Sequence, residues 1–413
     1  MTDDDDKSIE CGAVLARKAL ERLLVRAENA VAKEPAQTDR TGRSVTLPFS
    51  ENSFPEYLRL QRHADKVACN ARLQLAERDG AISVEWDRRA GERAHVQRIV
   101  LRDGAQLARH LKVKPRWDVM AQAKRQFESH VASYPVLAHV LDVWRKGNLL
   151  CGTRPGEVAP WLDAIQVVQY CASKCGDDIA IRRLSASLFR DSKRIEAIWP
   201  VLDTLVRGDA ATVPSEMEDL FSELGLIKFP PTLFVAGNVT VLYGDETVRA
   251  SRPYVGFAPS VIRSVHIDQG AGRRLLTVEN LTTFHEMAGQ RPNDAIVIYT
   301  GGMPSPSWKQ AYAVFLKALA PTAVFYHWGD IDLGGFRIAS HIAKCCEQEG
   351  RLLRLHGMRT DTLLSDTVAR SELGPAARRE ILTICERWGW SDEAAALGSL
   401  AVEQEAMDPS WPE

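Results

Sequence analysis

Three acidic residues in the second half of the chain have types and spacing suited to holding a divalent cation. Glu279 directly follows the apolar run Leu275–Val278, and Asp330 and Asp332 come just after the run Ala323–His327. Side chains alternate along an extended chain, so two aspartates separated by one residue point to the same side. Carboxylate oxygens hold Mg2+ while water or phosphate fills its other positions, so the pattern predicts a phosphoryl-transfer site.

Neighbouring residues suit an anionic substrate at this site. Gly334 and Gly335 allow a tight turn, and a helix expected from about Phe336 would direct its first amides towards an anion. Lys309 follows the Gly301–Gly302 turn and is a candidate phosphate contact, with an ordinary solvated lysine as the alternative.

Four short apolar runs must position these carboxylates. The runs are rich in β-branched and aromatic residues, and three helix-length segments separate them. Strands that alternate with helices predict a parallel sheet with helices on both faces, whose active site lies at the carboxyl ends of the strands. The expected strands are 275–278, 295–299, 323–327 and 351–355, and the expected helices are 282–290, 307–319 and 336–349.

The chain before this sheet is predicted to be mostly helical. Residues 116–225 carry apolar side chains at helical intervals, and residues 232–244 alternate around Gly237–Asn238 as a β-hairpin would. Helices that close on a hairpin form a winged-helix outline. Lys193 and Arg194 are candidate contacts to a DNA backbone, with an exposed helix face as the alternative.

The N-terminal region is predicted to be a helix-plus-hairpin module. Arg88, Arg89 and Arg93 lie in or beside the expected hairpin turn and are candidate DNA contacts. The alternative is an ordinary solvated hairpin, because basic residues are common on exposed faces. The expected helices are 8–33 and 54–78, and the expected strands are 81–86 and 95–101.

Composition indicates a soluble chain of two or three domains. Residues 1–7 look like an enterokinase-type cleavage sequence left by an expression vector, and without their four Asp and one Lys the formal net charge changes from -2 to about +1. Charge this close to neutral neither requires nor excludes nucleic acid. With no apolar run long enough for a membrane span and no cysteines at zinc-site spacing, we expect a cytoplasmic protein with reduced thiols.

Four motifs resemble the JetD family, the nuclease subunits of the bacterial Wadjet plasmid-defence systems. They are Val278–Phe284, Tyr299–Ser305, Gly329–Gly335 and, further upstream, Ser187–Glu196, and the resemblance covers about residues 180–405. Family members are similar in architecture to the A subunit of type IIB topoisomerases. The resemblance therefore implies an α/β Toprim domain preceded by helical and winged-helix-like domains.

The resemblance also implies an activity and partners. It implies a metal-dependent endonuclease that cuts closed circular double-stranded DNA, acts as a homodimer and works with an SMC-type ATPase complex of SMC, kleisin and KITE subunits. Transferred by position, Glu279, Asp330 and Asp332 are the catalytic residues that would hold Mg2+ or Mn2+. Glu403 and Glu405 match a recurring acidic segment, for which an exposed helix end is the simpler interpretation.

Two other functions remain open at this point. A transesterase like the topoisomerase VI A subunit would need a tyrosine nucleophile, but Phe189 stands where we place that tyrosine. The upstream tyrosines Tyr57, Tyr134 and Tyr170 are interpreted as partly buried helix residues with hydroxyls at the surface. The other alternative is a non-catalytic DNA clamp, which the intact spacing of all three carboxylates disfavours.

The predicted segments of the chain follow from these patterns. They are the vector remnant 1–7, an arm-like helix-plus-hairpin module 8–115, a helical and winged-helix-like DNA-binding domain 116–265, the Toprim catalytic domain 266–405 and a tail 406–413.

Overall fold

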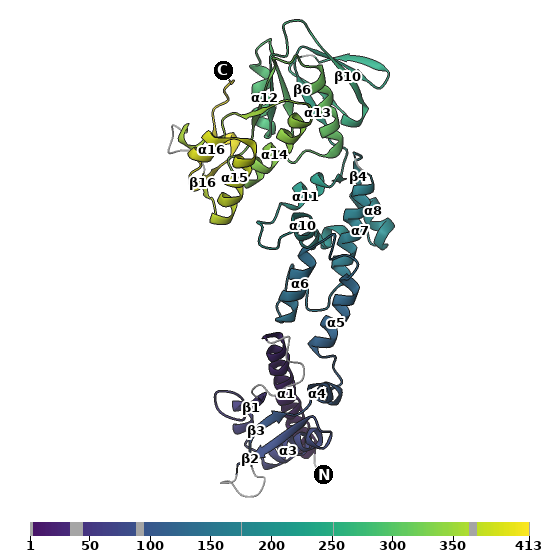
Figure 1. Ribbon diagram of the computed structural model, residues 1–413, viewed down its shortest axis with the longest axis vertical. Helices are drawn as coiled ribbons and strands as arrows, with labels where there is room; N and C mark the ends of the chain where they lie inside the picture. Colours follow the sequence, from purple (N-terminus) through teal and green to yellow (C-terminus); the bar gives the residue numbers. More distant parts are fainter. Residues whose placement is uncertain are drawn as a thin grey trace. The chain divides into compact units, whose positions relative to one another are not determined.

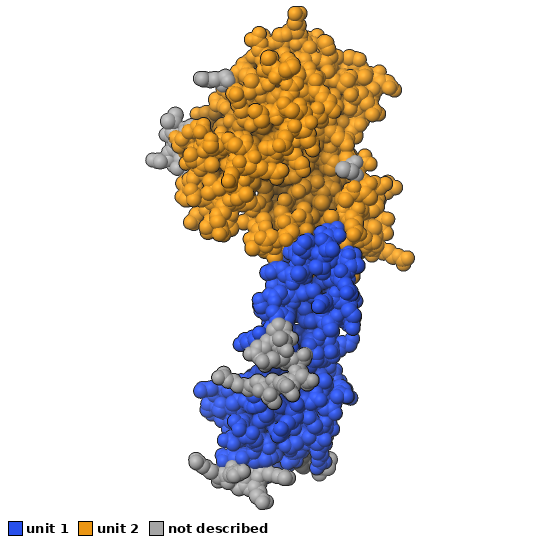
Figure 2. Space-filling view, viewed as in Figure 1, with its two compact units in different colours: residues 1–160 blue, residues 161–413 orange. Residues whose placement is uncertain are grey.

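The computed structural model divides the chain into two compact units, residues 1–160 and residues 161–413 (Figure 2). It describes residues 3–33, 44–87, 95–174, 176–250, 252–362 and 370–412. Helices and strands are labelled in Figure 1. Each unit has its own apolar core and is described by itself.

The first unit packs helices on a small antiparallel sheet of order β1-β3-β2. The predicted hairpin is confirmed, since β2 pairs with β3 from Ile82↔Leu101 to Trp86↔Val96. The turn that carries Arg88, Arg89 and Arg93 lies outside the described residues. The elements are α1 (Asp3–Lys33), β1 (Thr46–Pro48), α2 (Pro55–Leu58), α3 (His63–Arg78), β2 (Ile82–Trp86), β3 (Val96–Leu101), α4 (Gly104–Leu111), α5 (Arg116–Phe127) and α6 (Val136–Arg145).

Two features of this unit extend the sequence predictions. Helix α1 begins at Asp3, so helix continues through most of the segment interpreted as a vector remnant. Strand β1 was not predicted, because three residues inside a polar stretch carry no periodic signal. It pairs with β3 from Thr46↔Val100 to Pro48↔Arg98.

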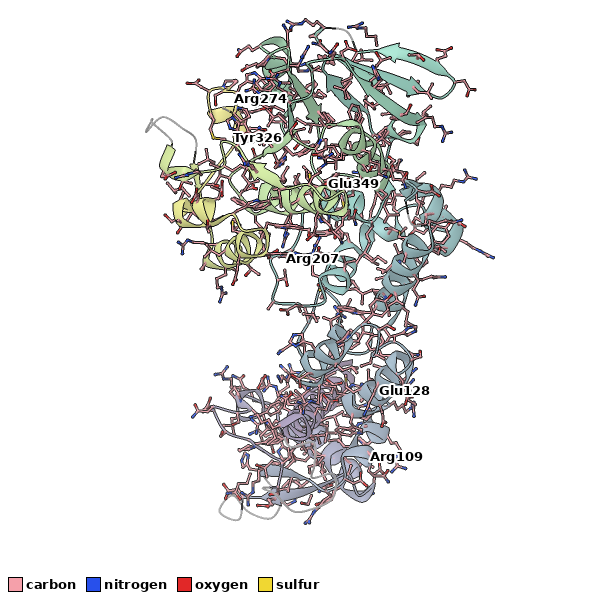
Figure 3. All side chains as sticks on the ribbon, turned by 45° about the horizontal axis from the view of Figure 1, so that its top comes forward. Arg109, Glu128, Arg207, Arg274, Tyr326 and Glu349 are labelled. Carbon is pink, nitrogen blue, oxygen red and sulfur yellow. The ribbon has the colours of Figure 1, made fainter. Side chains whose placement is uncertain are left out.

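Short helices fill the region between residues 116 and 225, as predicted. In the second unit Arg207 (labelled in Figure 3) contacts the carboxylates of Asp203 and Glu223, and so ties two of these helices together. The elements are α7 (Ala159–Ser173), β4 (Ile179–Ala180), α8 (Ile181–Phe189), α9 (Arg194–Ala197), α10 (Trp199–Arg207), α11 (Met217–Glu223) and β5 (Leu226–Ile227).

A six-stranded sheet of order β14-β13-β11-β12-β6-β9 forms the centre of the second unit. The four predicted strands are confirmed and pair in parallel, whereas β6 and β9 join antiparallel, so the sheet is mixed and not wholly parallel. The strands are β6 (Leu233–Ala236), β9 (Val255–Phe257), β11 (Arg274–Val278), β12 (Ala295–Tyr299), β13 (Val324–Trp328) and β14 (Leu353–Leu355).

The hairpin predicted for residues 232–244 is wrong. Both strands exist, but β6 joins the central sheet while β7 (Val239–Tyr243) pairs with β8 (Glu246–Arg249) and β10 (Ile262–Ile267). Between them, Asn238 donates to the Asn293 carbonyl and accepts from Arg291. These bonds anchor the expected turn to the loop before β12, so the chain crosses from one sheet to another at this point.

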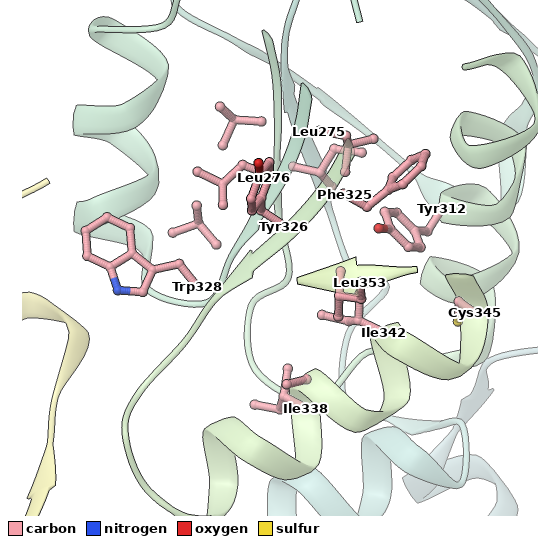
Figure 4. Packing of buried hydrophobic residues seen from close by; sticks show 14 of the residues in the cluster. Leu275, Leu276, Tyr312, Phe325, Tyr326, Trp328, Ile338, Ile342, Cys345 and Leu353 are labelled. Atoms are coloured by element: carbon pink, nitrogen blue, oxygen red, sulfur yellow. The ribbon is translucent and has the colours of Figure 1, made fainter. Parts of the chain in front are cut away.

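Helices cover both faces of the central sheet. Right-handed crossovers place α12 on the face opposite α13 and α14, because the chain moves one way from β11 to β12 and the other way from β12 to β13. Figure 4 shows helices on either side of these strands, with Leu353 close to Ile342 of α14. The three predicted helices are confirmed as α12 (Leu281–Gly289), α13 (Pro306–Ala318) and α14 (Leu333–Gln348).

The C-terminal region packs back onto this sheet. Arg274 at the start of β11 (Figure 3) donates to the Pro412 carbonyl over 2.7 Å and to Asp294 over 3.0 Å. Trp411 is among the side chains that contact the core of the unit. The remaining elements are η2 (Pro259–Val261), η3 (Thr360–Thr362), β15 (Arg370–Glu372), α15 (Pro375–Trp388), α16 (Ser391–Ala396), β16 (Leu400–Val402) and η4 (Gln404–Ala406).

Candidate metal centre

The parallel register of β11 and β13 brings Glu279 and Asp330 to one edge of the sheet. Val278 pairs with Trp328, so the residues that follow each strand end at the same level. The amide of Glu279 donates to the Trp328 carbonyl over 3.1 Å. The amide of Asp330 donates to Oε2 of Glu279 over 3.2 Å. Two residues far apart in the sequence are therefore joined directly.

Asp332 begins the next helix. It is the N-cap of α14, with extended backbone angles, and its Oδ1 accepts a hydrogen bond from the Gly335 amide over 2.8 Å. Gly335 must be glycine, because a Cβ there would lie 2.2 Å from the Asp330 carbonyl oxygen. One oxygen of Asp332 is thus engaged in capping, which holds the side chain beside the Asp330 turn.

Gly329 gives Glu279 its space. A Cβ added to Gly329 would lie 2.6 Å from Oε2 of Glu279 and 2.9 Å from Nε2 of His327. His327 is fully buried, and its Nδ1 lies 3.0 Å from the Thr277 hydroxyl. Burial lowers the pKa of His327 to about 3, so its ring is neutral. Gly329 therefore lies between the carboxyl group of Glu279 and the uncharged ring of His327, with no room for a larger side chain.

The electrostatics of the centre favour a bound cation. Burial raises the pKa of Glu279 to about 8, and the negative charge of Asp330 adds to the shift. Burial also raises the pKa of Asp330, although the hydrogen bond from the Gln404 amide lowers this pKa in part. Carboxyl groups that resist ionisation beside one another are stabilised as anions when a divalent cation binds between them.

A fourth carboxylate, Asp219, was missed by the sequence analysis. It lies on α11, where burial raises its pKa and the charges of Glu216 and Asp332 add to the effect, opposed by a hydrogen bond from the Met303 amide. Its charge also raises the pKa of Glu279, so it lies near the same cluster. Nothing in the local sequence could have identified it, because it belongs to a helix that precedes the sheet.

A buried ionic network fixes α11 and its surroundings relative to the sheet. Arg337 of α14 pairs with Glu380 over 2.7 Å and donates to the Val213 carbonyl over 2.7 Å. Its guanidinium also donates to the Ser215 hydroxyl, which accepts from Arg207 as well. The helices before the sheet and α14 are therefore joined through charge-assisted hydrogen bonds.

Gln404 is the second residue that the sequence analysis missed. It is fully buried, whereas its neighbours Glu403 and Glu405 are exposed. Exposure of the two glutamates is what the sequence analysis predicted. Its amide donates to Oδ1 of Asp330 over 2.7 Å. Glu405 accepts a hydrogen bond from the side chain of Asn280 over 2.7 Å. The C-terminal segment thus contacts the centre from outside the predicted strands.

The donor set suits a hard divalent cation. The side chains at this edge offer carboxylate oxygens, which Mg2+ and Mn2+ prefer, and the crowding of negative charge would be relieved by such an ion. Within the described residues, no three His, Cys, Asp or Glu side chains converge as a ready ligand shell. The fit of these residues to a divalent cation accordingly rests on their donor chemistry and charge, and not on a formed ligand shell.

The other predicted contact residues lie in different environments. Lys309 is half-buried, and its Nζ lies 3.3 Å from Nδ1 of His341, where burial lowers the pKa of both groups. Arg194 forms an ion pair with Asp163 over 2.7 Å. Lys193 is exposed. Of these three basic residues, Lys193 is therefore the one most accessible to a DNA backbone.

The upstream tyrosines differ from their predicted setting. Tyr57 is fully buried, and its hydroxyl donates to Asn70 over 2.9 Å and accepts from the Val96 amide over 3.1 Å, so the prediction of a surface hydroxyl is wrong for it. Tyr134 lies in the turn before α6 and Tyr170 lies on α7, and both are half-buried. Phe189 ends α8.

Comparisons with known proteins match both parts of the chain. A family described as "Wadjet protein JetD, C-terminal" matches residues 239–410, and a family described as an uncharacterized protein conserved in bacteria, N-terminal, matches residues 17–207. The Wadjet protein JetD of Bacillus cereus (strain Q1) is 27% identical over 177 residues, which are 41% of this chain and 42% of that protein. Among the described residues, no helix is long and apolar enough to cross a membrane. Taken together, the two family matches and this relative show that the chain belongs to the JetD family.

Proposed function

We propose that this protein is a divalent-metal-dependent endodeoxyribonuclease that hydrolyses phosphodiester bonds. The observation that supports it best is the joining of Glu279 and Asp330 at the ends of two parallel strands, through the hydrogen bond from the Asp330 amide to Glu279. Both pKa values are raised by burial and by neighbouring carboxylates, as expected of a site that binds a cation.

Each side chain has a part in this proposal. Glu279, Asp330 and Asp332 would hold Mg2+ or Mn2+, and the ion would activate water and neutralise charge on the scissile phosphate. The capping bond to Gly335 orients Asp332. Glu279 carries a proton near neutral pH when no cation is bound, because its pKa is about 8, and it would have to lose that proton before it could hold the ion or accept a proton from water.

The order of the acidic residues supports a fold, and the matched relative supports a substrate. A glutamate after the first parallel strand and two aspartates after the third suit a Toprim domain, and the helices before it suit a winged-helix-like DNA-binding domain. The matched relative is named for the Wadjet system. We therefore propose closed circular plasmid DNA as substrate, other Wadjet components including an SMC-type ATPase complex as partners, and a homodimer as the active form.

Incubation of the purified protein with plasmid tests this function. Supercoiled and linear plasmid are each mixed with the protein in Mg2+, in Mn2+ or in a chelator, with and without the SMC-type complex. We expect cutting of the circular form only when a divalent cation is present, and none by Asp330→Asn. Cutting that persists in the chelator would rule out metal-dependent hydrolysis.

A further inference from the structure

A C-terminal segment, residues 400–405, lies against the turn that carries Asp330 and Asp332. The amide of Ile331 donates to the Val402 carbonyl over 2.8 Å, and the amide of Val402 donates to the Ile331 carbonyl over 3.2 Å. This antiparallel bridge fixes the register of the segment. Gln404, two residues later, is consequently held inside the centre, with Glu403 and Glu405 turned outwards.

Gln404 bonds to both strand ends at once. Its Nε2 donates to the Trp328 carbonyl at the end of β13 over 3.0 Å. Its Oε1 accepts from the Asn280 amide, directly after Glu279, over 2.8 Å. Its own amide donates to Asp330 over 2.7 Å. One side chain and one peptide unit therefore tie the Trp328 carbonyl, the Asn280 amide and the Asp330 carboxylate into a single frame.

The chemistry of these bonds requires a neutral amide. The Trp328 carbonyl needs a donor and the Asn280 amide needs an acceptor, and a glutamine side chain offers both. A carboxylate of the same size could only accept, and it would add negative charge beside Glu279 and Asp330. Because the site is fully buried, an unmatched polar group there would be costly.

We infer that Gln404 is a positioning residue that sets the orientation of Glu279 and Asp330 towards a divalent cation. The inference rests on the proposed function. Its role differs from that of an added ligand, since its side-chain bonds are to backbone groups and its amide reaches Asp330. Loss of the frame should weaken binding of the cation even where a new carboxylate would attract it.

The test measures Mn2+ binding to the DNA-free protein from the signal of free Mn2+ in electron paramagnetic resonance. The variants are Gln404→Glu, Gln404→Asn and Gln404→Met. The control is Gln290→Glu, which adds the same negative charge at the exposed end of α12. Removing groups that orient metal ligands typically costs about 10- to 100-fold in affinity. We expect a loss of this size for every Gln404 variant and no change for Gln290→Glu.

The Glu variant separates positioning from simple electrostatics. If residue 404 acted only through charge, Gln404→Glu would bind Mn2+ more tightly than wild type, and that result would overturn the inference. Circular dichroism and thermal unfolding identify any variant that does not fold. A second measurement needs no variant. In the wild-type protein, the amide hydrogens of residues 400–405 should exchange with solvent more slowly when Mn2+ is present than when it is absent. Equal exchange rates would also overturn the inference.

The failure of this inference can be told apart from failure of the proposed function. If wild type binds Mn2+ and cuts plasmid while folded Gln404 variants bind Mn2+ as tightly, the positioning role is wrong and the nuclease proposal stands. If wild type neither binds Mn2+ nor cuts DNA in any divalent metal, the proposed function is wrong and the positioning role has no site on which to act.

Discussion

The Asp330 amide donates a hydrogen bond to the Glu279 carboxylate across 51 residues of sequence. The bond depends on two parallel strands that end at the same level and on a glycine, Gly329, that leaves room for the carboxylate. It holds the carboxyl groups of Glu279 and Asp330 close together in a partly buried setting, where two negative charges would be unfavourable without a cation. Charge, protonation and space around Glu279 should therefore each affect how the centre works.

Neutralising the carboxylates should stop cutting. Glu279→Gln, Asp330→Asn and Asp332→Asn each remove charge that would hold the cation, and we expect plasmid cleavage to fall by at least about 100-fold. DNA binding, measured by fluorescence anisotropy, should stay close to wild type, because the basic surface is unchanged. Retained cleavage by Asp332→Asn would remove that residue from the centre.

Glu279 should make the metal-free protein less stable as pH rises. Its pKa is raised from 4.5 to about 8, so the folded state keeps the proton at pH values where the unfolded chain has lost it. Its contribution to the free energy of unfolding therefore falls between about pH 4.5 and about pH 8. Thermal unfolding without metal should show a weaker pH dependence for Glu279→Gln than for wild type. Equal pH dependence would mean that Glu279 is ionised at neutral pH.

The same proton should be released when a cation binds. Below about pH 8 a cation must displace the proton of Glu279, so affinity should rise about tenfold for each pH unit. Titration calorimetry with Mn2+ in two buffers of different ionisation enthalpy, at about pH 6 and about pH 7, gives both the affinity and the proton count. Binding that is equal at both values, with no proton released, would contradict this expectation.

Gly329→Ala should displace Glu279 without unfolding the protein. The added Cβ would meet Oε2 of Glu279 at 2.6 Å, closer than atoms in contact allow. We expect a loss of cleavage of about 10-fold or more, because misplacing a reacting group by about 1 Å can cost about 100-fold. Gly374→Ala is the matched control, since a Cβ there meets nothing within 4 Å. Full activity of Gly329→Ala would mean that Glu279 can move freely.

The tyrosines before the sheet should be dispensable for cutting. Tyr57→Phe, Tyr134→Phe and Tyr170→Phe should all cleave plasmid and leave DNA ends without attached protein. Tyr57→Phe alone should lower the free energy of unfolding, by about 1–3 kcal/mol, because the buried Val96 amide loses its acceptor. Labelled protein that stays on DNA ends after denaturation, and is absent in one of these variants, would support a transesterase instead.

Basic residues of the N-terminal hairpin should contribute to DNA binding. Reversing Arg88, Arg89 and Arg93 to Glu should weaken binding and reduce its salt dependence, by a slope of about 0.9 for each phosphate that the protein no longer neutralises. Arg194→Ala is a useful comparison, because Arg194 is engaged with Asp163. Unchanged affinity and slope in the triple variant would support a solvated hairpin.

The sequence predicted the parts of the fold that local patterns encode. The strands around Leu276, Val297 and Phe325 are buried on both faces, so continuous apolar runs identify them. The partners of β6 and β7 could not be predicted, since alternation marks a strand without naming its neighbour. The bonds that divert the chain at Asn238 come from residues more than fifty positions away.

The candidate site was likewise predictable only where its residues follow strands. Glu279, Asp330 and Asp332 each follow a recognisable apolar run, and parallel strands bring such ends together. Asp219 and Gln404 reach the centre from a short helix and from the C-terminal segment. A glutamine between two glutamates reads as exposed surface, and its burial depends on the bridge between Val402 and Ile331.

That bridge also bears on the order in which the protein is made. Gln404 follows Asn280 by 124 residues, so a growing chain completes β11 well before the residue that frames it exists. At the usual speed of translation the interval is on the order of ten seconds. During it the Trp328 carbonyl, the Asn280 amide and the Asp330 carboxylate lack their Gln404 bonds, so the frame of the centre closes among the last steps of synthesis. A chain that stops before residue 404 never acquires it.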